Sequence, residues 1–169
     1  MTRKPRLLLA ALLATAGTAG AADLTLNVEI PNLPVAEYHR PYVAVWVEDG
    51  SQTIAANLAL WYQVRGDHTK WLPDLRQWWR RGGRDVKVPV DGLTGATRPA
   101  GQHILKFDAA AAPLSQLKPG KYELVVEAVR EVGGREAVRI PFEWPVKAAQ
   151  RGNAQGKTEL GAVALVLNP

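Results

Sequence analysis

Short stretches in which apolar and polar residues alternate recur along the chain and constrain its fold more than any other feature. The clearest is 24–30, Leu-Thr-Leu-Asn-Val-Glu-Ile, whose period of two is typical of a strand with one buried face. A second stretch, 42–48, is followed by Asp49-Gly50, which favours a hairpin into a third strand near 54–63. Further strands are predicted at 85–90, 102–107, 121–130, 136–142 and 160–167. Their spacing predicts an all-β fold, an immunoglobulin-like antiparallel β-sandwich.

Two segments depart from the strand pattern. Residues 73–81 predict one short helix, because Pro73 suits the first helical position, Arg80 lies near the C-terminal end and Gly82 can cap that end. The segment 151–156 is polar and contains two glycines, so we interpret it as a loop.

The first residues predict export from the cytoplasm. A basic start precedes a run of Leu and Ala over 7–16, and the small residues at 19–22 resemble a cleavage site, so residues 1–22 are interpreted as a cleaved signal peptide. The apolar run is too short to span a membrane. We therefore expect residues 23–169 to form one soluble domain in the periplasm.

Composition excludes several classes of function. Without the signal peptide, the 21 basic and 16 acidic residues become 18 and 16, so nucleic-acid binding is not expected. The absence of cysteine excludes disulfides, iron–sulfur clusters and haem attachment through cysteine. The three histidines are far apart in the sequence, which argues against a metal site, and no hydrolase or phosphate-binding-loop motif is present.

Residues 91–101 form a segment of another kind, Asp-Gly-Leu-Thr-Gly-Ala-Thr-Arg-Pro-Ala-Gly. Its glycines and proline break both the strand and the helix pattern, so it is interpreted as an exposed loop. Such a loop of small residues can enter the active site of another enzyme, where a threonine hydroxyl can attack an activated phosphate. In an ordinary turn, Asp91 would instead make an Asx-turn and the glycines would supply positive φ angles.

The run Asp91-x-x-Thr94-Gly95-Ala96-Thr97 resembles the acceptor motif Asp-x-x-Ser/Thr-Gly-Ala-Ser/Thr of bacterial flavin transferases of the ApbE type. Five constrained positions should match by chance in a chain of this length with a probability on the order of 10⁻³. In that family the enzyme cleaves FAD with the help of Mg²⁺ and joins FMN to the last hydroxyl residue through a phosphoester bond. The resemblance therefore implies FMN on Thr97, recognition through the other motif residues, and an FAD:protein FMN transferase as a partner.

A second resemblance covers most of the exported chain. The segment Trp-Leu-Pro-Asp-Leu-x-x-Trp-Trp at 71–79, followed by the motif at 91–97, is similar to a family of predicted periplasmic proteins of unknown function. Members occur beside PepSY-domain membrane proteins and flavin transferases. The resemblance implies an electron carrier rather than an enzyme, with a PepSY-type membrane redox protein as one partner and an unidentified periplasmic electron acceptor as another.

Three further residues are candidates for contacts with the flavin or its phosphate: Trp78, Trp79 and Arg98. Adjacent helical residues point in different directions, so the two tryptophans cannot be equally buried. Attachment through the phosphate leaves the isoalloxazine ring at the end of the ribityl arm, so a deep FMN pocket is not required, and the sequence signals none.

Two other functions are compatible with the sequence. One is an exported immunoglobulin-like binding module without a cofactor, whose tryptophan and arginine surface docks a protein or a glycan and whose 91–101 segment is an ordinary turn. The other is a reductase, in which FMN bound to this domain reduces a small substrate.

Overall fold

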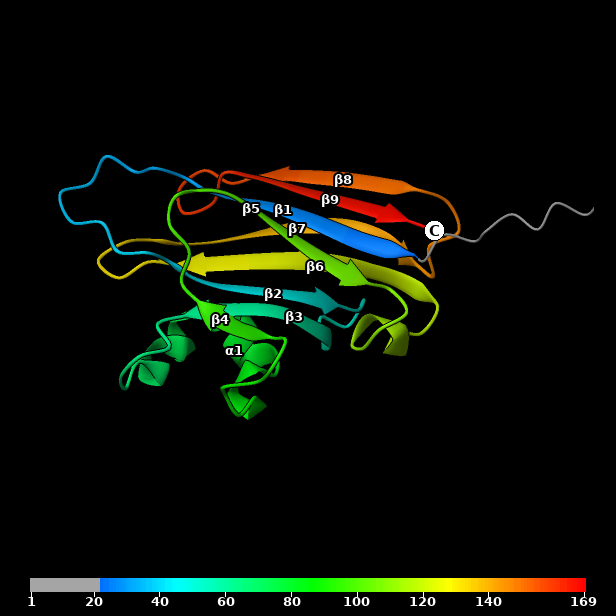
Figure 1. The fold of residues 1–169 in the computed structure, drawn as a ribbon, viewed down its shortest axis with the longest axis horizontal. Helices are drawn as coiled ribbons and strands as arrows, with labels where there is room; N and C mark the ends of the chain where they lie inside the picture. Colours follow the sequence, from blue (N-terminus) through cyan, green and yellow to red (C-terminus); the bar gives the residue numbers. More distant parts are fainter. Residues whose placement is uncertain (1–21) are drawn as a thin grey trace, which may run out of the picture.

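The computed structural model describes residues 22–169, which form two β-sheets packed face to face (Figure 1). The four-stranded sheet has the order β5 (Gly101–Asp108), β1 (Asp23–Ile30), β9 (Ala162–Asn168) and β8 (Gln150–Gln155). The five-stranded sheet has the order β4 (Thr94–Ala96), β3 (Ile54–Tyr62), β2 (Tyr42–Glu48), β6 (Gly120–Val129) and β7 (Arg135–Trp144). The predicted all-β sandwich is confirmed. The predicted signal peptide lies outside the described residues, apart from Ala22.

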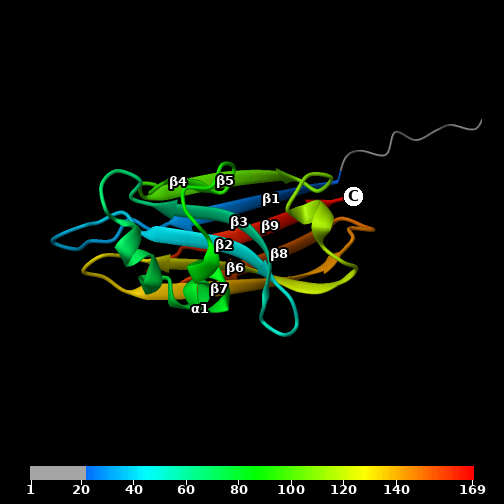
Figure 2. The ribbon, with the colours of Figure 1, turned by 90° about the horizontal axis from the view of Figure 1, so that it is seen from below.

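Short helical elements cover the outer face of the five-stranded sheet (Figures 1 and 2). They are η1 (Thr69–Asp74), α1 (Arg76–Arg81) and η2 (Gly83–Asp85), while η3 (Leu114–Gln116) lies between β5 and β6. The predicted helix over 73–81 is confirmed from residue 76 onward, and its end at Gly82 is confirmed as well. Its predicted start is wrong, because Pro73 lies inside the 3₁₀ helix η1 and Leu75 separates the two helices.

A tertiary contact fixes the start of α1. The carboxylate of Glu127 on β6 is fully buried and accepts hydrogen bonds from the backbone N–H groups of Gln77 (3.1 Å) and Trp78 (2.9 Å). These are among the first N–H groups of the helix, which have no partner within it. A capping residue 49 positions away along the chain leaves no local signal, which is why the sequence places the helix start too early.

The central strand β2 is apolar on both faces. Val43, Val45 and Val47 pack into the core between the sheets, whereas Ala44 and Trp46 pack into a second cluster beneath α1. A strand covered on both faces reads as a nearly continuous apolar run, as β2 does. At its end the buried carboxylate of Glu48 accepts hydrogen bonds from three side chains on β2, α1 and β7: Trp46 Nε1 (3.1 Å), Arg81 (2.8 Å) and Arg139 (3.1 Å).

Part of the predicted loop is a strand. Residues 94–96 form β4, which pairs with the edge of β3 in the parallel direction, so the sandwich is not antiparallel throughout. Parallel neighbours require a long crossover, and residues 63–93 supply one that includes α1. The pairing uses backbone groups, such as Leu60 N–H with Leu93 O (2.8 Å). This backbone pairing depends little on the types of side chain in β4, so a search for alternating apolar and polar residues could not reveal the strand.

Two further predictions are wrong. Residues 86–90 are irregular, and Val86 and Val88 pack separately against the cluster beneath α1, so their alternation reflects burial without strand pairing. Conversely, the predicted loop at 151–156 contains strand β8. Its inward positions are the small residues Gly152 and Ala154, and a Cβ at Gly152 would collide with Ile140. Because these inward residues are small rather than large and apolar, the sequence of β8 does not show the alternation typical of a strand.

The loop before β9 is held by one carboxylate. Glu136 on β7 accepts hydrogen bonds from the four backbone N–H groups of residues 157–160, at 2.6 to 3.0 Å. Burial alone would raise the pKa of Glu136, but these four bonds together outweigh it and hold the pKa below the usual value of 4.5. The loop is therefore fixed best when Glu136 is ionised.

We expect Glu136 to stabilise the fold in a pH-dependent way. Because its pKa is lower in the folded state, its contribution is fully present above the unfolded pKa and is lost as the pH falls through the folded value. The free energy of unfolding, measured by urea denaturation at a series of pH values, should show this in the comparison with Glu136→Gln. The difference between wild type and variant should shrink as the pH drops below the usual glutamate pKa. A difference that stays constant or grows would contradict the assignment.

Candidate functional site

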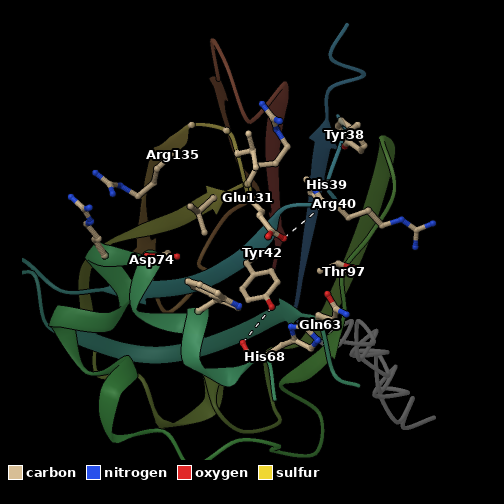
Figure 3. Close-up of a pocket in the computed structure, with 17 residues that line it drawn as sticks. Tyr38, His39, Arg40, Tyr42, Gln63, His68, Asp74, Thr97, Glu131 and Arg135 are labelled. Atoms are coloured by element: carbon tan, nitrogen blue, oxygen red, sulfur yellow. Dashed lines mark hydrogen bonds and ion pairs between the residues drawn. The ribbon is translucent and has the colours of Figure 1, made fainter. Parts of the chain in front are cut away.

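Thr97 lies where the chain passes from one sheet to the other. Strand β4 ends at the exposed Ala96 on the edge of the five-stranded sheet, and β5 begins at Gly101 in the four-stranded sheet. The backbone N–H of Thr97 donates to the carbonyl oxygen of Tyr62 at the end of β3 (3.2 Å). This bond fixes the backbone, and the half-buried Thr97 side chain lines a cavity (Figure 3).

The two threonines of the motif have different environments. The Thr94 hydroxyl donates to the carbonyl oxygen of Val90 (2.9 Å) and accepts from the Val90 N–H (3.1 Å), so it closes the turn that precedes β4. Within residues 22–169, the Thr97 hydroxyl has no hydrogen-bond partner and is the one that lines the cavity. The structure thus distinguishes two hydroxyls that composition alone could not.

The fold itself does not demand the other motif residues. Asp91 is exposed, and the Asx-turn considered for it does not form, because the turn is closed by the Thr94 N–H and the Val90 carbonyl (3.0 Å). A Cβ at Gly95 would meet Trp61 Cδ1 at 3.7 Å, which is an ordinary contact. An aspartate at 91 and a glycine at 95 are therefore not explained by packing.

Arg98 lies against Trp61 and is not part of the cavity lining. Its guanidinium carbon lies 5.5 Å from the centre of the Trp61 ring, within the range of a cation–π contact. The same ring packs edge-on against His103, whose Nε2 donates to the Pro99 carbonyl oxygen (2.7 Å). Arg98 is absent from the cavity lining, so its predicted contact with the flavin or its phosphate has no support from this arrangement.

The cavity beside Thr97 has a volume of about 680 Å³, within the usual range of small-molecule sites. It lies at the end of the sandwich where β2 begins and where β3 and β6 end. Its walls come from the β1–β2 connection (38–40), the segment between 63 and 76, the β6–β7 turn (130–135) and Thr97. The structure thus places a cavity beside the loop, which the sequence did not signal. Four segments that are distant in sequence create it.

The tryptophan at the cavity is not one of those expected. Trp78 is only 1% exposed, packs in the cluster beneath α1, and its Nε1 donates to Asn57 Oδ1 (2.8 Å). Trp79 is half-buried against the same cluster, and neither tryptophan lines the cavity. Trp71 does line it and is 49% exposed. It was missed because it belongs to η1, ahead of the predicted helix.

The cavity lining is charged. Four arginines and two carboxylates contribute to it: Arg40, Arg76, Arg130 and Arg135 with Asp74 and Glu131. His39 Nδ1 lies 3.6 Å from Glu131 Oε2 and links the β1–β2 connection to the β6–β7 turn (Figure 3). Two of the arginines have carboxylate partners outside the lining, Glu159 for Arg130 (2.9 Å) and Glu127 for Arg135 (3.8 Å), so the charges of the site nearly balance.

A buried ion pair shapes one wall. Arg130 is 7% exposed and donates to Glu159 from Nε (2.9 Å) and Nη2 (3.2 Å), while the Gly134 N–H donates to the same carboxylate (2.7 Å). Arg130 Nη1 and the hydroxyl of Tyr38 are buried without a partner in the described part of the chain. Desolvation raises the pKa of Tyr38, which keeps it a neutral donor. Leaving such a group unpaired costs about 1–3 kcal/mol.

A family model described as "Predicted periplasmic protein (DUF2271)" matches residues 23–162. The chain belongs to this family. The match includes the 91–101 segment and every residue that lines the cavity, so the site lies within the region that defines the family. No curated protein and no solved structure matches the chain significantly.

No helix within residues 22–169 is both long and apolar enough to cross a membrane. The same range contains no cluster of three or more metal-ligating side chains.

Proposed function

We propose that the chain is a periplasmic electron carrier with FMN attached to Thr97 through a phosphoester bond. The observation that carries this proposal is the difference between the two motif hydroxyls. Thr94 is engaged twice by Val90, whereas Thr97 is unengaged among the described residues and faces a cavity. The resemblance of 91–97 to the acceptor motif of ApbE-type transferases supplies the chemistry.

The attachment reaction is a phosphoryl transfer. The Thr97 hydroxyl oxygen attacks the FMN phosphorus of FAD, the bond to the AMP phosphate oxygen breaks, AMP leaves and the hydroxyl proton is released. Such reactions depend mainly on in-line positioning and on neutralisation of charge by metal, both of which the transferase would supply. This chain contributes an exposed edge with Asp91 and Ala96 at the surface. The transferase can therefore reach the hydroxyl at the sandwich edge.

The residues around Thr97 fit a flavin. The cavity has a suitable size, Trp71 and Tyr42 offer aromatic surface, and arginines offer hydrogen-bond donors. FMN, when bound, supplies the ability to accept and donate one or two electrons. A covalent bond suits the periplasm, because free FMN is scarce there and a reversibly bound flavin would dissociate by mass action.

Partners would approach at the same end of the sandwich. Exposed apolar side chains lie on three of the segments that surround the cavity: Val35 (42% exposed), Val64 (49%) and Val132 (77%). Such residues on a protein surface are typical of contact sites when they gather in one region. We propose an ApbE-type transferase, a PepSY-type membrane redox protein and a periplasmic electron acceptor as the proteins that meet this end.

Peptide mass spectrometry after co-expression with an ApbE-type transferase tests the proposal. An FMN mass on the peptide that contains Thr97 supports it, and a protein that stays yellow after denaturation agrees. An unmodified peptide in the presence of an active transferase contradicts it and favours the binding module.

We expect Asp91→Asn and Gly95→Ala to impair flavin attachment without harming the fold. Asp91 is exposed and a Cβ at Gly95 has room, so stability should change by no more than about 0.5 kcal/mol. Both positions are constrained in the motif, so the fraction of protein that carries FMN should fall. Thermal unfolding and intact mass after a short co-expression measure the two effects. Lys87→Gln, an exposed change outside the motif, is the control. Normal attachment in both variants would contradict the recognition role.

A further inference from the structure

We propose that the cavity beside Thr97 binds the isoalloxazine ring of the attached flavin, with Trp71 as its main aromatic contact. The inference rests on the proposed attachment at Thr97 and adds a ring-binding site to it. It differs from the expectation drawn from the sequence, in which the ring is held only by its ribityl arm and extends into solvent.

The position of the tether is the first support. Thr97 is itself part of the lining, so a group attached to its hydroxyl starts inside the site (Figure 3). A tethered group reaches an effective concentration in the millimolar range. A cavity that binds free flavin only weakly would therefore hold the attached ring for much of the time.

The aromatic surface is the second support. Trp71 lines the cavity and is 49% exposed, although a ring of this size would usually be buried, and Lys70 Nζ lies 5.6 Å from its centre. Tyr42 is half-buried, and its hydroxyl donates to the His68 carbonyl oxygen (3.3 Å), which fixes the ring near the middle of the lining (Figure 3). Planar heteroaromatic rings stack well on such side chains.

The hydrogen-bond donors of the wall are the third support. One edge of isoalloxazine carries carbonyl oxygens and ring nitrogens that accept hydrogen bonds. Arg40 and Arg76 are exposed and line the cavity, so their guanidinium groups can donate to this edge. The unpaired Arg130 Nη1 and Tyr38 hydroxyl belong to residues of the same wall but are closed to solvent, so the ring reaches them only if the wall moves.

Binding of free FMN to protein made without a transferase gives the first test. The six tryptophans should give six indole N–H signals in a ¹⁵N-correlated spectrum, assigned with Trp71→Leu and Trp79→Leu. Adding FMN should shift the Trp71 signal in a saturable way and leave the Trp79 signal unchanged. Trp71→Leu should weaken binding roughly 5- to 150-fold, the range for loss of one aromatic stack. Trp79→Leu, a half-buried tryptophan outside the cavity, is the matched control.

Fluorescence of the flavinylated protein gives the second test. A ring stacked on Trp71 should be quenched relative to free FMN, and Trp71→Leu should restore much of the emission while the attached fraction stays the same. Binding of free FMN without any adduct at Thr97 would overturn the attachment but support the ring site. An adduct with the emission of free FMN, insensitive to Trp71→Leu, would overturn the ring site alone. A response to Trp79→Leu in place of Trp71→Leu would also overturn it.

Discussion

Thr97→Ala is expected to abolish flavin attachment and leave the domain folded. The variant removes the attacking oxygen, and within residues 22–169 the Thr97 hydroxyl supports no hydrogen bond whose loss would weaken the fold. Attachment should fall below detection, since no other hydroxyl in the motif is available: Thr94 is held by Val90 on both its donor and its acceptor side. In-gel flavin fluorescence after co-expression with a transferase measures the loss, and thermal unfolding checks the fold.

Three companion variants separate the chemistry of attachment from the structure of the loop. Thr97→Ser keeps a hydroxyl and should retain part of the adduct. Thr94→Ser keeps the two hydrogen bonds to Val90, so the fraction of protein that carries FMN should hardly change. Thr94→Val loses both bonds, which loosens the turn, so the flavinylated fraction should fall. Full attachment in Thr94→Val would show that this turn is not needed for recognition.

Loss of one partner of the buried pair Arg130–Glu159 should be the most destabilising change in the cavity wall. The two side chains are 6% and 4% exposed, and Glu159 also accepts from the Gly134 N–H. Either Arg130→Met or Glu159→Leu leaves a buried charge without its partner, which should lower the free energy of unfolding by about 3–5 kcal/mol. Urea denaturation measures the free energy of unfolding.

The double variant Arg130→Met with Glu159→Leu provides the control. It removes both charges together, so it should be more stable than the sum of the two single changes predicts. Additive losses would show that the pair is not coupled. Because the pair holds the β6–β7 turn against the loop before β9, the single variants should also weaken flavin binding at the cavity.

The sequence predicted those strands whose large apolar side chains alternate. Strand β1 is an example, with four fully or nearly fully buried positions between polar ones. It failed for β8, where Gly152 and Ala154 face inward, and for β4, whose three residues pair through their backbone. The start of α1 depends on Glu127, which is distant in sequence. Local patterns cannot report partners of this kind.

The proposed attachment residue, Thr97, could be named from the sequence because a motif is local, and both the residue and its chemistry stay predictions. The cavity could not be predicted from the sequence, since its walls come from segments between 38 and 135 that meet only in the folded chain. The sequence analysis named Trp78 and Trp79, the pair on the predicted helix, and did not consider Trp71. The structure buries Trp78 beneath α1 and leaves Trp71 at the cavity.

Peptide mass spectrometry on protein exported together with an active ApbE-type transferase tests the central claim most directly. The account predicts one FMN per chain, located by fragmentation on Thr97, and no FMN on the Thr97→Ala protein. An adduct on any other residue, an adduct that survives Thr97→Ala, or an unmodified wild-type chain would contradict it.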